Sequence, residues 1–243
     1  MNLIIDIGNT KIKAAVFEQD TLQSKEIINY DNWQKSIESI LKKNATIQNI
    51  VVSSVSKIGK DSFLFLNSNY KLFFVSREMN FPFTNQYETP TTLGIDRMVL
   101  AAGAVLRFPN TNRLVIDAGT CVTYDYIDEN DNYLGGAISP GIRLRYEALN
   151  NYTAKLPLLT KEEPQKTIGN STHQSIHSGV INGLTFEIEG FVNNYSENQK
   201  NFIIILTGGD ADFLAKRLKN TIFANSNFLL ESLNQTFQYN QND

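Results

Sequence analysis

The chain has 243 residues, 42% hydrophobic and 19% charged, and carries a formal net charge of −3 at pH 7. This composition is typical of a folded chain with a sizeable core and excludes disordered, collagen-like and disulfide-rich proteins. The negative charge and the lack of a basic stretch argue against nucleic acid as a partner. Cys121 is the only cysteine, which fits a reducing compartment.

The sequence has no segment typical of a secretion signal or a membrane span. Only a short apolar run, residues 3–5, precedes Asp6, and a signal peptide needs a longer apolar core with a positive flank. The longest apolar stretch, residues 98–106, is well short of the ~20 residues that cross a bilayer. We therefore expect a cytoplasmic protein without membrane contact.

The sequence of the first half predicts strands and helices in alternation. Strands are expected at 3–7, 11–17, 50–52 and 71–75. Trp33, Ile37 and Leu41 have helical spacing behind Asp31, a candidate N-cap. A second helix is expected at 96–108, with Asp96 near its positively polarised N-terminus.

The second half predicts a similar succession of elements. Strands are expected at 114–118, 121–127, 133–138 and 202–206, and helices at 142–150, 173–195 and 211–218. Pro140 and Gly141 predict a turn, and the Asn- and Gln-rich end from Gln238 is expected to fray.

A short pattern occurs twice at an offset of about half the chain. Asp6 and Asp117, 111 residues apart, each follow an apolar strand and precede a glycine and a threonine, and a second strand comes next. We interpret this as a duplicated α/β fold whose halves each begin with a β-hairpin.

Known phosphate-binding loops of the P-loop and Rossmann types are absent from the sequence. Both Asp-x-Gly turns supply backbone N–H groups, a hydroxyl and a carboxylate, and residues 207–211 join a strand to a helix through two glycines. The two carboxylates suit cations that neutralise a polyphosphate. A single such turn would indicate only turn chemistry, whereas the repeated set favours a phosphate site.

Five segments in order resemble the motifs of type III pantothenate kinases, within the actin-like, acetate and sugar kinase superfamily. They are residues 6–13, 93–97, 117–120, 135–141 and 207–211. The resemblance implies a duplicated ribonuclease H-like fold whose halves, 1–112 and 113–243, flank a nucleotide cleft. It also implies ATP-dependent phosphorylation of pantothenate to 4′-phosphopantothenate, the first step of coenzyme A biosynthesis, with Mg²⁺, a monovalent cation (K⁺ or NH₄⁺) and a homodimer.

The resemblance also implies roles for individual residues. Asp96 matches the general base, Asp117 a ligand of the monovalent cation, and Asp6 a group that holds Mg²⁺, directly or through water. The expected ATP-binding residues are Asp6, Ile7, Gly8, Asn9, Thr10, Lys11, Ile12, Lys13 and Thr120. The expected pantothenate-binding residues are Tyr87, Gly94, Ile95, Asp96, Arg97 and Thr172. Elementary chemistry supports the pair Asp96 and Arg97, because a carboxylate can accept the hydroxyl proton and a guanidinium fork can bind an acid.

Several alternatives stay open. Another kinase of the superfamily would share the phosphate turns, and a nucleotide-binding regulator would have lost catalysis. His173 and His177 have a spacing that can bind zinc, but the lack of a third ligand favours an ordinary polar face. Lys11 and Lys13 could screen phosphates or simply be solvated, and Cys121 stands where the family usually has a small residue such as alanine.

Overall fold

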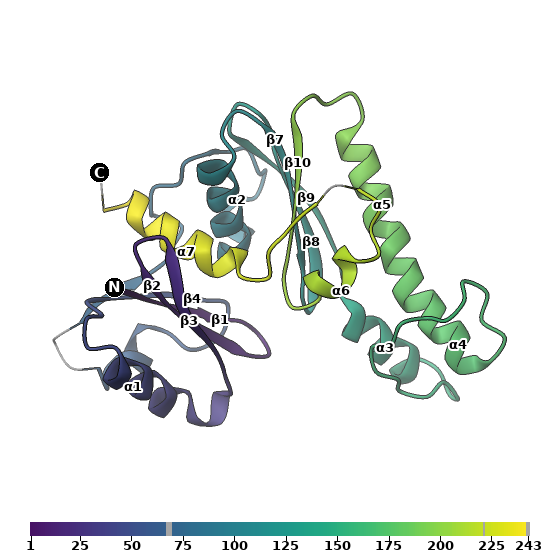
Figure 1. Ribbon diagram of the computed structural model, residues 1–243, viewed down its shortest axis with the longest axis horizontal. Helices are drawn as coiled ribbons and strands as arrows, with labels where there is room; N and C mark the ends of the chain where they lie inside the picture. The colour runs from purple at the N-terminus through teal and green to yellow at the C-terminus, as the bar shows by residue number, and fades with distance from the viewer. Residues whose placement is uncertain (67–69, 221, 242–243) are drawn as a thin grey trace. The chain divides into compact units, whose positions relative to one another are not determined.

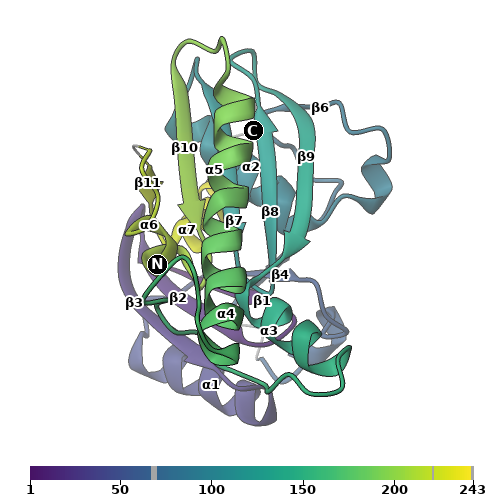
Figure 2. The ribbon, with the colours of Figure 1, turned by 90° about the vertical axis from the view of Figure 1, so that its right-hand side faces the viewer.

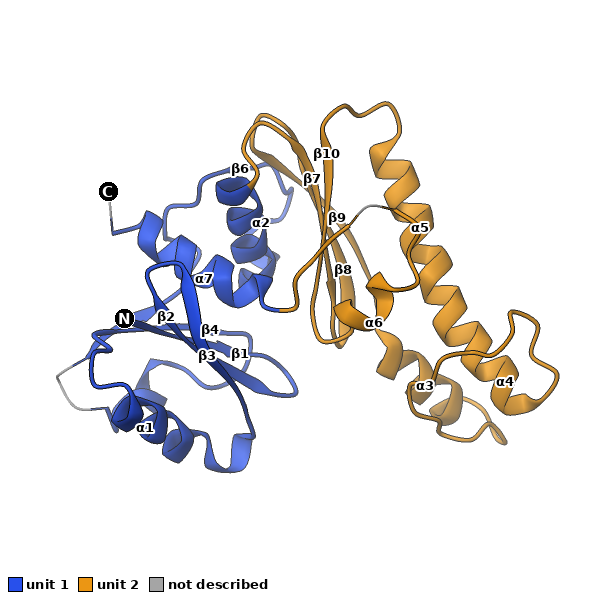
Figure 3. Cartoon of the chain, viewed as in Figure 1, with its two compact units in different colours: residues 1–107, 227–243 blue, residues 108–226 orange. Residues whose placement is uncertain are grey.

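The computed structural model describes residues 1–66, 70–220 and 222–241, and the chain forms two compact units (Figures 1 and 3). One unit comprises residues 1–107 and 227–243, and the other comprises residues 108–226. The border near residue 107 is close to the predicted division after residue 112. The C-terminal segment differs from the prediction, because residues from 227 onward belong to the first unit.

The sheet of the first unit has the strand order β3-β2-β1-β4-β5. Its strands are β1 (Asn2–Ile7), β2 (Ile12–Glu18), β3 (Thr21–Ile28), β4 (Asn49–Ser54) and β5 (Lys71–Phe74). The hairpin partners β1, β2 and β3 run antiparallel, whereas β4 and β5 continue the sheet in parallel. The central strand β1 is apolar on both faces because both faces are covered.

Helices cover the sheet of the first unit. They are α1 (Trp33–Lys43), α2 (Ile95–Arg107) and α7 (Phe228–Tyr239). Short 3₁₀ turns occur at Tyr30–Asn32, Lys60–Phe63 and Pro90–Thr92, and residues Thr84–Asn85 form the two-residue strand β6, which is not part of this sheet. Helix α1 packs Ile37 and Ile40 into one core, together with alternate residues of β1 such as Ile5. Helix α7 lies beside α2 and contacts β1 and β4 (Figure 1).

The sheet of the second unit repeats this topology. Its strands are β7 (Asn112–Ala118), β8 (Cys121–Ile127), β9 (Asn132–Pro140), β10 (Phe202–Thr207) and β11 (Phe223–Ala224). Within the unit they have the order β11-β10-β7-β8-β9, with an antiparallel hairpin followed by parallel strands. The predicted duplication of a hairpin-led α/β fold is confirmed, because each sheet places its first three strands and its next two in the same order.

The helices of the second unit are α3 (Ile142–Asn151), α4 (Thr172–His177), α5 (Gly183–Ser196) and α6 (Ala211–Ala215), with a π-turn, η4, at Ser178–Asn182. Helix α5 runs along the sheet (Figure 2), and its Leu184 and Ile188 pack against Ile116 and Leu206. Among the residues that the structure describes, no helix combines the length and apolar character needed to cross a bilayer.

Most predicted elements are present, and the main differences concern the α1 cap, α6, β3 and α7. The predicted Asp31 cap is wrong, because Asp31 lies in a 3₁₀ turn and Asn32 precedes α1. Helix α6 ends at Ala215 rather than at 218. Strand β3 was not predicted, since its side chains are mostly exposed, as in an edge strand.

Helix α7 was also not predicted, although residues up to Tyr239 of the expected frayed end belong to it. Leu230, Leu233 and Phe237 are buried at steps of three and four, a helical pattern that went unrecognised in the sequence among the polar residues around it. Polar residues such as Asn234 are buried on the same helix. The Asn234 side chain is satisfied in this position: it donates to the Gln19 carbonyl at 2.8 Å and accepts from Asn2 at 2.9 Å. Residues 242–243 of the expected frayed end lie outside the described residues.

Candidate active site

The first Asp-x-Gly turn joins β1 to β2. The Gly8 amide donates to the Lys11 carbonyl at 3.2 Å, and the Tyr30 hydroxyl donates to the Gly8 carbonyl. Asn9, Thr10 and Lys11 are exposed, so the tip of the turn can meet a ligand. Two of the predicted ATP-binding residues, Ile7 and Ile12, have side chains that are fully buried in the core. Only their backbone groups could contact a phosphate.

Asp6 precedes this turn and is almost completely buried, with 6% of its surface exposed. Burial is the main cause that raises the pKa of Asp6 to about 6; Asp96 raises it further, and Lys13, its partner across the hairpin, opposes the shift. A bound cation would stabilise the ionised form of such a buried carboxylate, because its positive charge compensates for the lost hydration.

The loop before α2 brings four predicted substrate residues together. Asp96 lies in the first turn of α2, and its Oδ1 accepts from the Arg97 amide at 2.9 Å. The Arg97 guanidinium is buried and lies 5.7 Å from the centre of the Tyr87 ring. Gly94 lies against this carboxylate: a Cβ atom there would lie 2.4 Å from Asp96 Oδ1, so a side chain at this position would make the carboxylate turn away. The fifth residue, Ile95, is buried in the core.

Arg77 supports the same loop and was not identified in the sequence. Its Nε and Nη2 atoms both donate to the Leu93 carbonyl, at 3.1 and 2.8 Å. Arg77 also lines a cavity of about 420 Å³ together with Ser54, Ser76 and Gly94. No local pattern could have revealed it, because the contact joins segments 16 residues apart without a shared helix or strand.

The second Asp-x-Gly turn, between β7 and β8, is held by two other segments. The Gly119 amide donates to the Cys121 carbonyl at 2.9 Å, and the Gly141 amide donates to the Thr120 carbonyl at 3.0 Å. The Asp210 amide donates to the Ala118 carbonyl, also at 3.0 Å. The motifs predicted at 117–120, 135–141 and 207–211 therefore meet within one unit.

Gly208 lies next to the Asp117 carboxylate. Its φ of +97° favours glycine, and a Cβ atom there would lie 2.4 Å from both Asp117 Oδ1 and the Ala118 carbonyl oxygen. Two oxygen atoms thus converge beside a residue that has no side chain. Thr207, the preceding residue, is 1% exposed, and its hydroxyl has no hydrogen-bond partner among the described residues.

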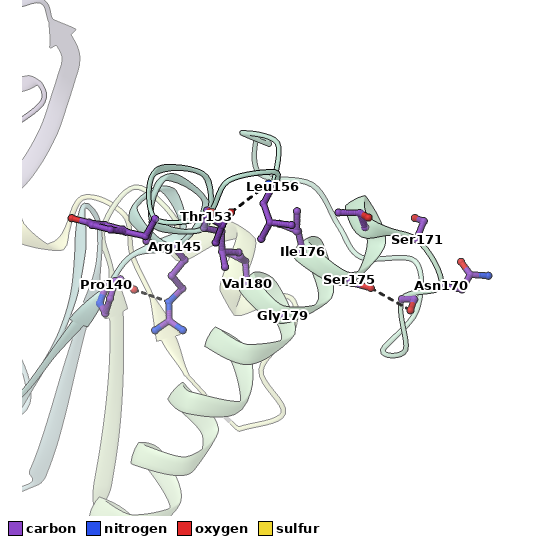
Figure 4. Close-up of a pocket in the computed structure, with 15 residues that line it drawn as sticks. Pro140, Arg145, Thr153, Leu156, Asn170, Ser171, Ser175, Ile176, Gly179 and Val180 are labelled. Carbon is purple, nitrogen blue, oxygen red and sulfur yellow. Dashed lines mark hydrogen bonds between the residues drawn. The ribbon is translucent and has the colours of Figure 1, made fainter.

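Thr172, the remaining predicted substrate contact, lies away from the Asp117 turn. It is the first residue of α4, whose N-cap is Ser171, and it is exposed. Thr172 lines a largely apolar cavity of about 1110 Å³ between α3 and α4, where Arg145 donates to the Pro140 carbonyl (Figure 4).

Among the described residues, no three or more His, Cys, Asp or Glu side chains gather into a group that could hold a metal ion. His177 Nδ1 lies 2.7 Å from the Tyr146 hydroxyl, and His173 is exposed on the same short helix. Cys121 is a free, exposed thiol beside the second turn.

Comparison with known proteins decides the family. Residues 2–194 match the family model of type III pantothenate kinase. The chain belongs to the type III pantothenate kinase family. The type III pantothenate kinase of Flavobacterium psychrophilum is 63% identical over 239 residues, which cover 98% of this chain and 99% of that protein.

Solved structures agree on the fold of this type III pantothenate kinase. Component A of (R)-2-hydroxyglutaryl-CoA dehydratase from Acidaminococcus fermentans matches with a TM-score of 0.54 at 13% identity, covering 99% of this chain and 97% of that one. A glucokinase from an Antarctic psychrotroph matches with a TM-score of 0.50 at 11% identity, covering 100% and 99%. The predicted actin-like and sugar kinase fold is confirmed.

Membership in the family also establishes the reaction class. The chain is an ATP-dependent phosphotransferase that acts on pantothenate in coenzyme A biosynthesis. The two alternative functions, another small-molecule kinase of the superfamily and a nucleotide-binding regulator without catalysis, are not favoured.

Proposed function

We propose that Asp96 is the general base that activates the primary hydroxyl of pantothenate. The supporting observation is the Asp96–Arg97 pair at the start of α2, in which Asp96 is half-buried and Arg97 is buried against Tyr87. The Arg97 guanidinium would bind the carboxylate of pantothenate, and Gly94 would let the substrate approach closely. This arrangement would hold the hydroxyl near the base.

The step is a direct phosphoryl transfer. Asp96 accepts the hydroxyl proton while the hydroxyl oxygen bonds to the γ-phosphorus of ATP, and the bond from that phosphorus to the β–γ bridging oxygen breaks to release ADP. The products are 4′-phosphopantothenate, ADP and a proton. Such a transfer depends mainly on positioning and charge neutralisation, so the protein must hold the phosphates as firmly as the acceptor.

The two Asp-x-Gly turns would bind the phosphates. In the first unit, the exposed tip around Asn9 and Thr10 would donate backbone N–H groups, and Asp6 would hold Mg²⁺ directly or through water. In the second unit, Thr120 would contact the phosphates from its turn. A divalent ion bound at Asp6 would neutralise charge on the transferring group.

Asp117 would hold the monovalent cation, K⁺ or NH₄⁺. The fit rests on the donor set, because a carboxylate oxygen and the Ala118 carbonyl oxygen converge beside Gly208. Oxygen ligands of this kind suit a hard monovalent cation.

We further propose a cytoplasmic homodimer in which Thr172 reaches pantothenate. Several apolar residues around the α3–α4 region are strongly exposed, including Tyr152 at 89% and Ile168 at 84%. Exposed apolar patches often mark interfaces. Light scattering on purified protein should give the mass of a dimer, and Tyr152→Asp should shift it to the monomer. Leu64→Asp, a change at an equally exposed leucine of the other unit, should leave the dimer intact.

One assay tests the reaction and its ion requirements. Purified protein with Mg-ATP and K⁺ should release ADP when pantothenate is added, and glucose or acetate should give no release. Omission of K⁺ should lower the rate, and Asp117→Asn should remove that response. ADP release with sugars but not with pantothenate would contradict the proposal.

A further inference from the structure

Asp117 on β7 and Thr207 on β10 lie opposite each other in the parallel strand pair. Thr207 is the parallel neighbour of Asp117, just as Leu206 is the neighbour of Ile116. Ile116 and Leu206 point into the core under α5. Because side chains alternate along a strand, Asp117 and Thr207 both lie on the opposite face, on strands about 4.8 Å apart.

Thr207 carries one of several buried hydroxyl groups that lack a hydrogen-bond partner among the described residues. The residue is 1% exposed, and its Oγ1 has no hydrogen-bond partner within the part of the chain that the structure describes. Burial of a hydroxyl without a partner costs free energy, and valine would fill the same space without that cost. Thr207 differs from the other such residues in its position, because it pairs with Asp117 and precedes Gly208, beside which the Asp117 and Ala118 oxygens converge. A cation bound there would give the hydroxyl a partner.

We propose that Thr207 Oγ1 is a further ligand of the monovalent cation at Asp117. Asp117 Oδ1 and the Ala118 carbonyl already converge beside Gly208, the residue that follows Thr207. A hydroxyl oxygen adds a neutral ligand to one carboxylate and one carbonyl, and this mixture suits a large monovalent ion with several oxygen ligands. The inference rests on the proposed cation at Asp117 and adds a residue to it.

The first unit contains a matched pair. Ser53 is the parallel neighbour of Asp6 across β1 and β4 and is fully buried. Its hydroxyl also finds no hydrogen-bond partner in residues 1–66, 70–220 and 222–241. Since no monovalent cation is assigned to Asp6, Ser53 serves as the control for a general effect of removing a buried hydroxyl beside a carboxylate.

Thermal unfolding in a K⁺ titration tests the inference without measuring activity. The titration is done at constant ionic strength, with choline as the replacing ion and saturating Mg-ADP present. Thr207→Val should raise the K⁺ concentration at half-maximal stabilisation roughly tenfold or more, as lost metal ligation does. Thr207→Ser, which keeps the hydroxyl, and Ser53→Ala should follow the wild type, and Asp117→Asn should lose the response.

The outcomes separate this inference from the proposed function. A normal K⁺ response of Thr207→Val, with loss of response in Asp117→Asn, would overturn the role of Thr207 alone. A wild type without any K⁺ response would overturn the cation assignment to Asp117 and this inference with it. Thr207→Ala is tested in parallel, so that a folding defect of one variant cannot decide the result. Without K⁺, Thr207→Val should unfold no earlier than the wild type, because it removes an unpaired hydroxyl.

Discussion

Asp96 accepts a hydrogen bond from the Arg97 amide and is also the proposed general base. One substitution separates these two roles. Asp96→Asn keeps an oxygen that can accept from the Arg97 amide, so α2 should begin as before. The amide cannot accept the hydroxyl proton, so kcat should fall by roughly 10²–10⁴. Steady-state kinetics gives the rate, and the unfolding temperature and ATP binding serve as controls. A purified Asp96→Asn protein with nearly normal kcat would refute the assignment.

Asp6 predicts a pH dependence of stability with a definite sign. Between its ordinary pKa of 3.8 and its folded value of about 6, the folded state holds a proton that the unfolded state has lost. The free energy of unfolding should therefore fall as the pH rises through this window, by a few kcal/mol at most, and level off above it. Asp6→Asn should lack this component.

Urea unfolding in EDTA, from about pH 4 to about pH 7, tests this sign. The difference in stability between Asp6→Asn and the wild type should grow in favour of the variant as the pH rises. Parallel curves for the two proteins would show that Asp6 does not hold its proton in the folded state. EDTA is needed because a bound cation would favour the ionised carboxylate.

At the scale of elements, the end of β10 contains two adjacent glycines with different requirements. A Cβ atom on Gly208 would collide with Asp117 Oδ1 and with the Ala118 carbonyl, and its φ is positive, whereas a Cβ atom on Gly209 would meet nothing within 4 Å. Gly208→Ala should destabilise the protein by about 2–4 kcal/mol and weaken the K⁺ response. Gly209→Ala should change stability by less than about 1 kcal/mol.

Chemical denaturation of the two glycine variants measures this contrast directly. Equal stabilities would mean that the turn at Asp117 can move aside without cost. That outcome would also remove the argument that Gly208 keeps the oxygens of Asp117 and Ala118 close together.

At the scale of the whole molecule, the last helix belongs to the unit that begins the chain. Helix α7 packs on α2, β1 and β4, and its Phe237 ring lies 4.8 Å from Phe73. Truncation after Ser226 should therefore expose the core of the first unit and abolish its cooperative unfolding. Truncation after Gln241 keeps α7 and the bond from Asn240 to the Asn80 carbonyl, and it should unfold like the wild type.

Circular dichroism during heating and limited proteolysis compare the two truncations. The shorter chain should be cleaved within residues 1–107 while residues 108–226 stay protected. A normal unfolding transition of the first unit without residues 227–243 would contradict this account of its core.

The sequence by itself determined the repeated hairpins, the turns at Asp6 and Asp117, most of the strands and the family. These features depend on short patterns, such as apolar alternation followed by Asp-x-Gly, that are legible within a few residues. Only the tertiary structure decided that α7 completes the first unit, that Arg77 holds the Leu93 carbonyl and that Thr207 lies beside Asp117 without a partner. Each of these depends on a contact between segments that are separated in the chain, and such contacts are set by packing rather than by local pattern.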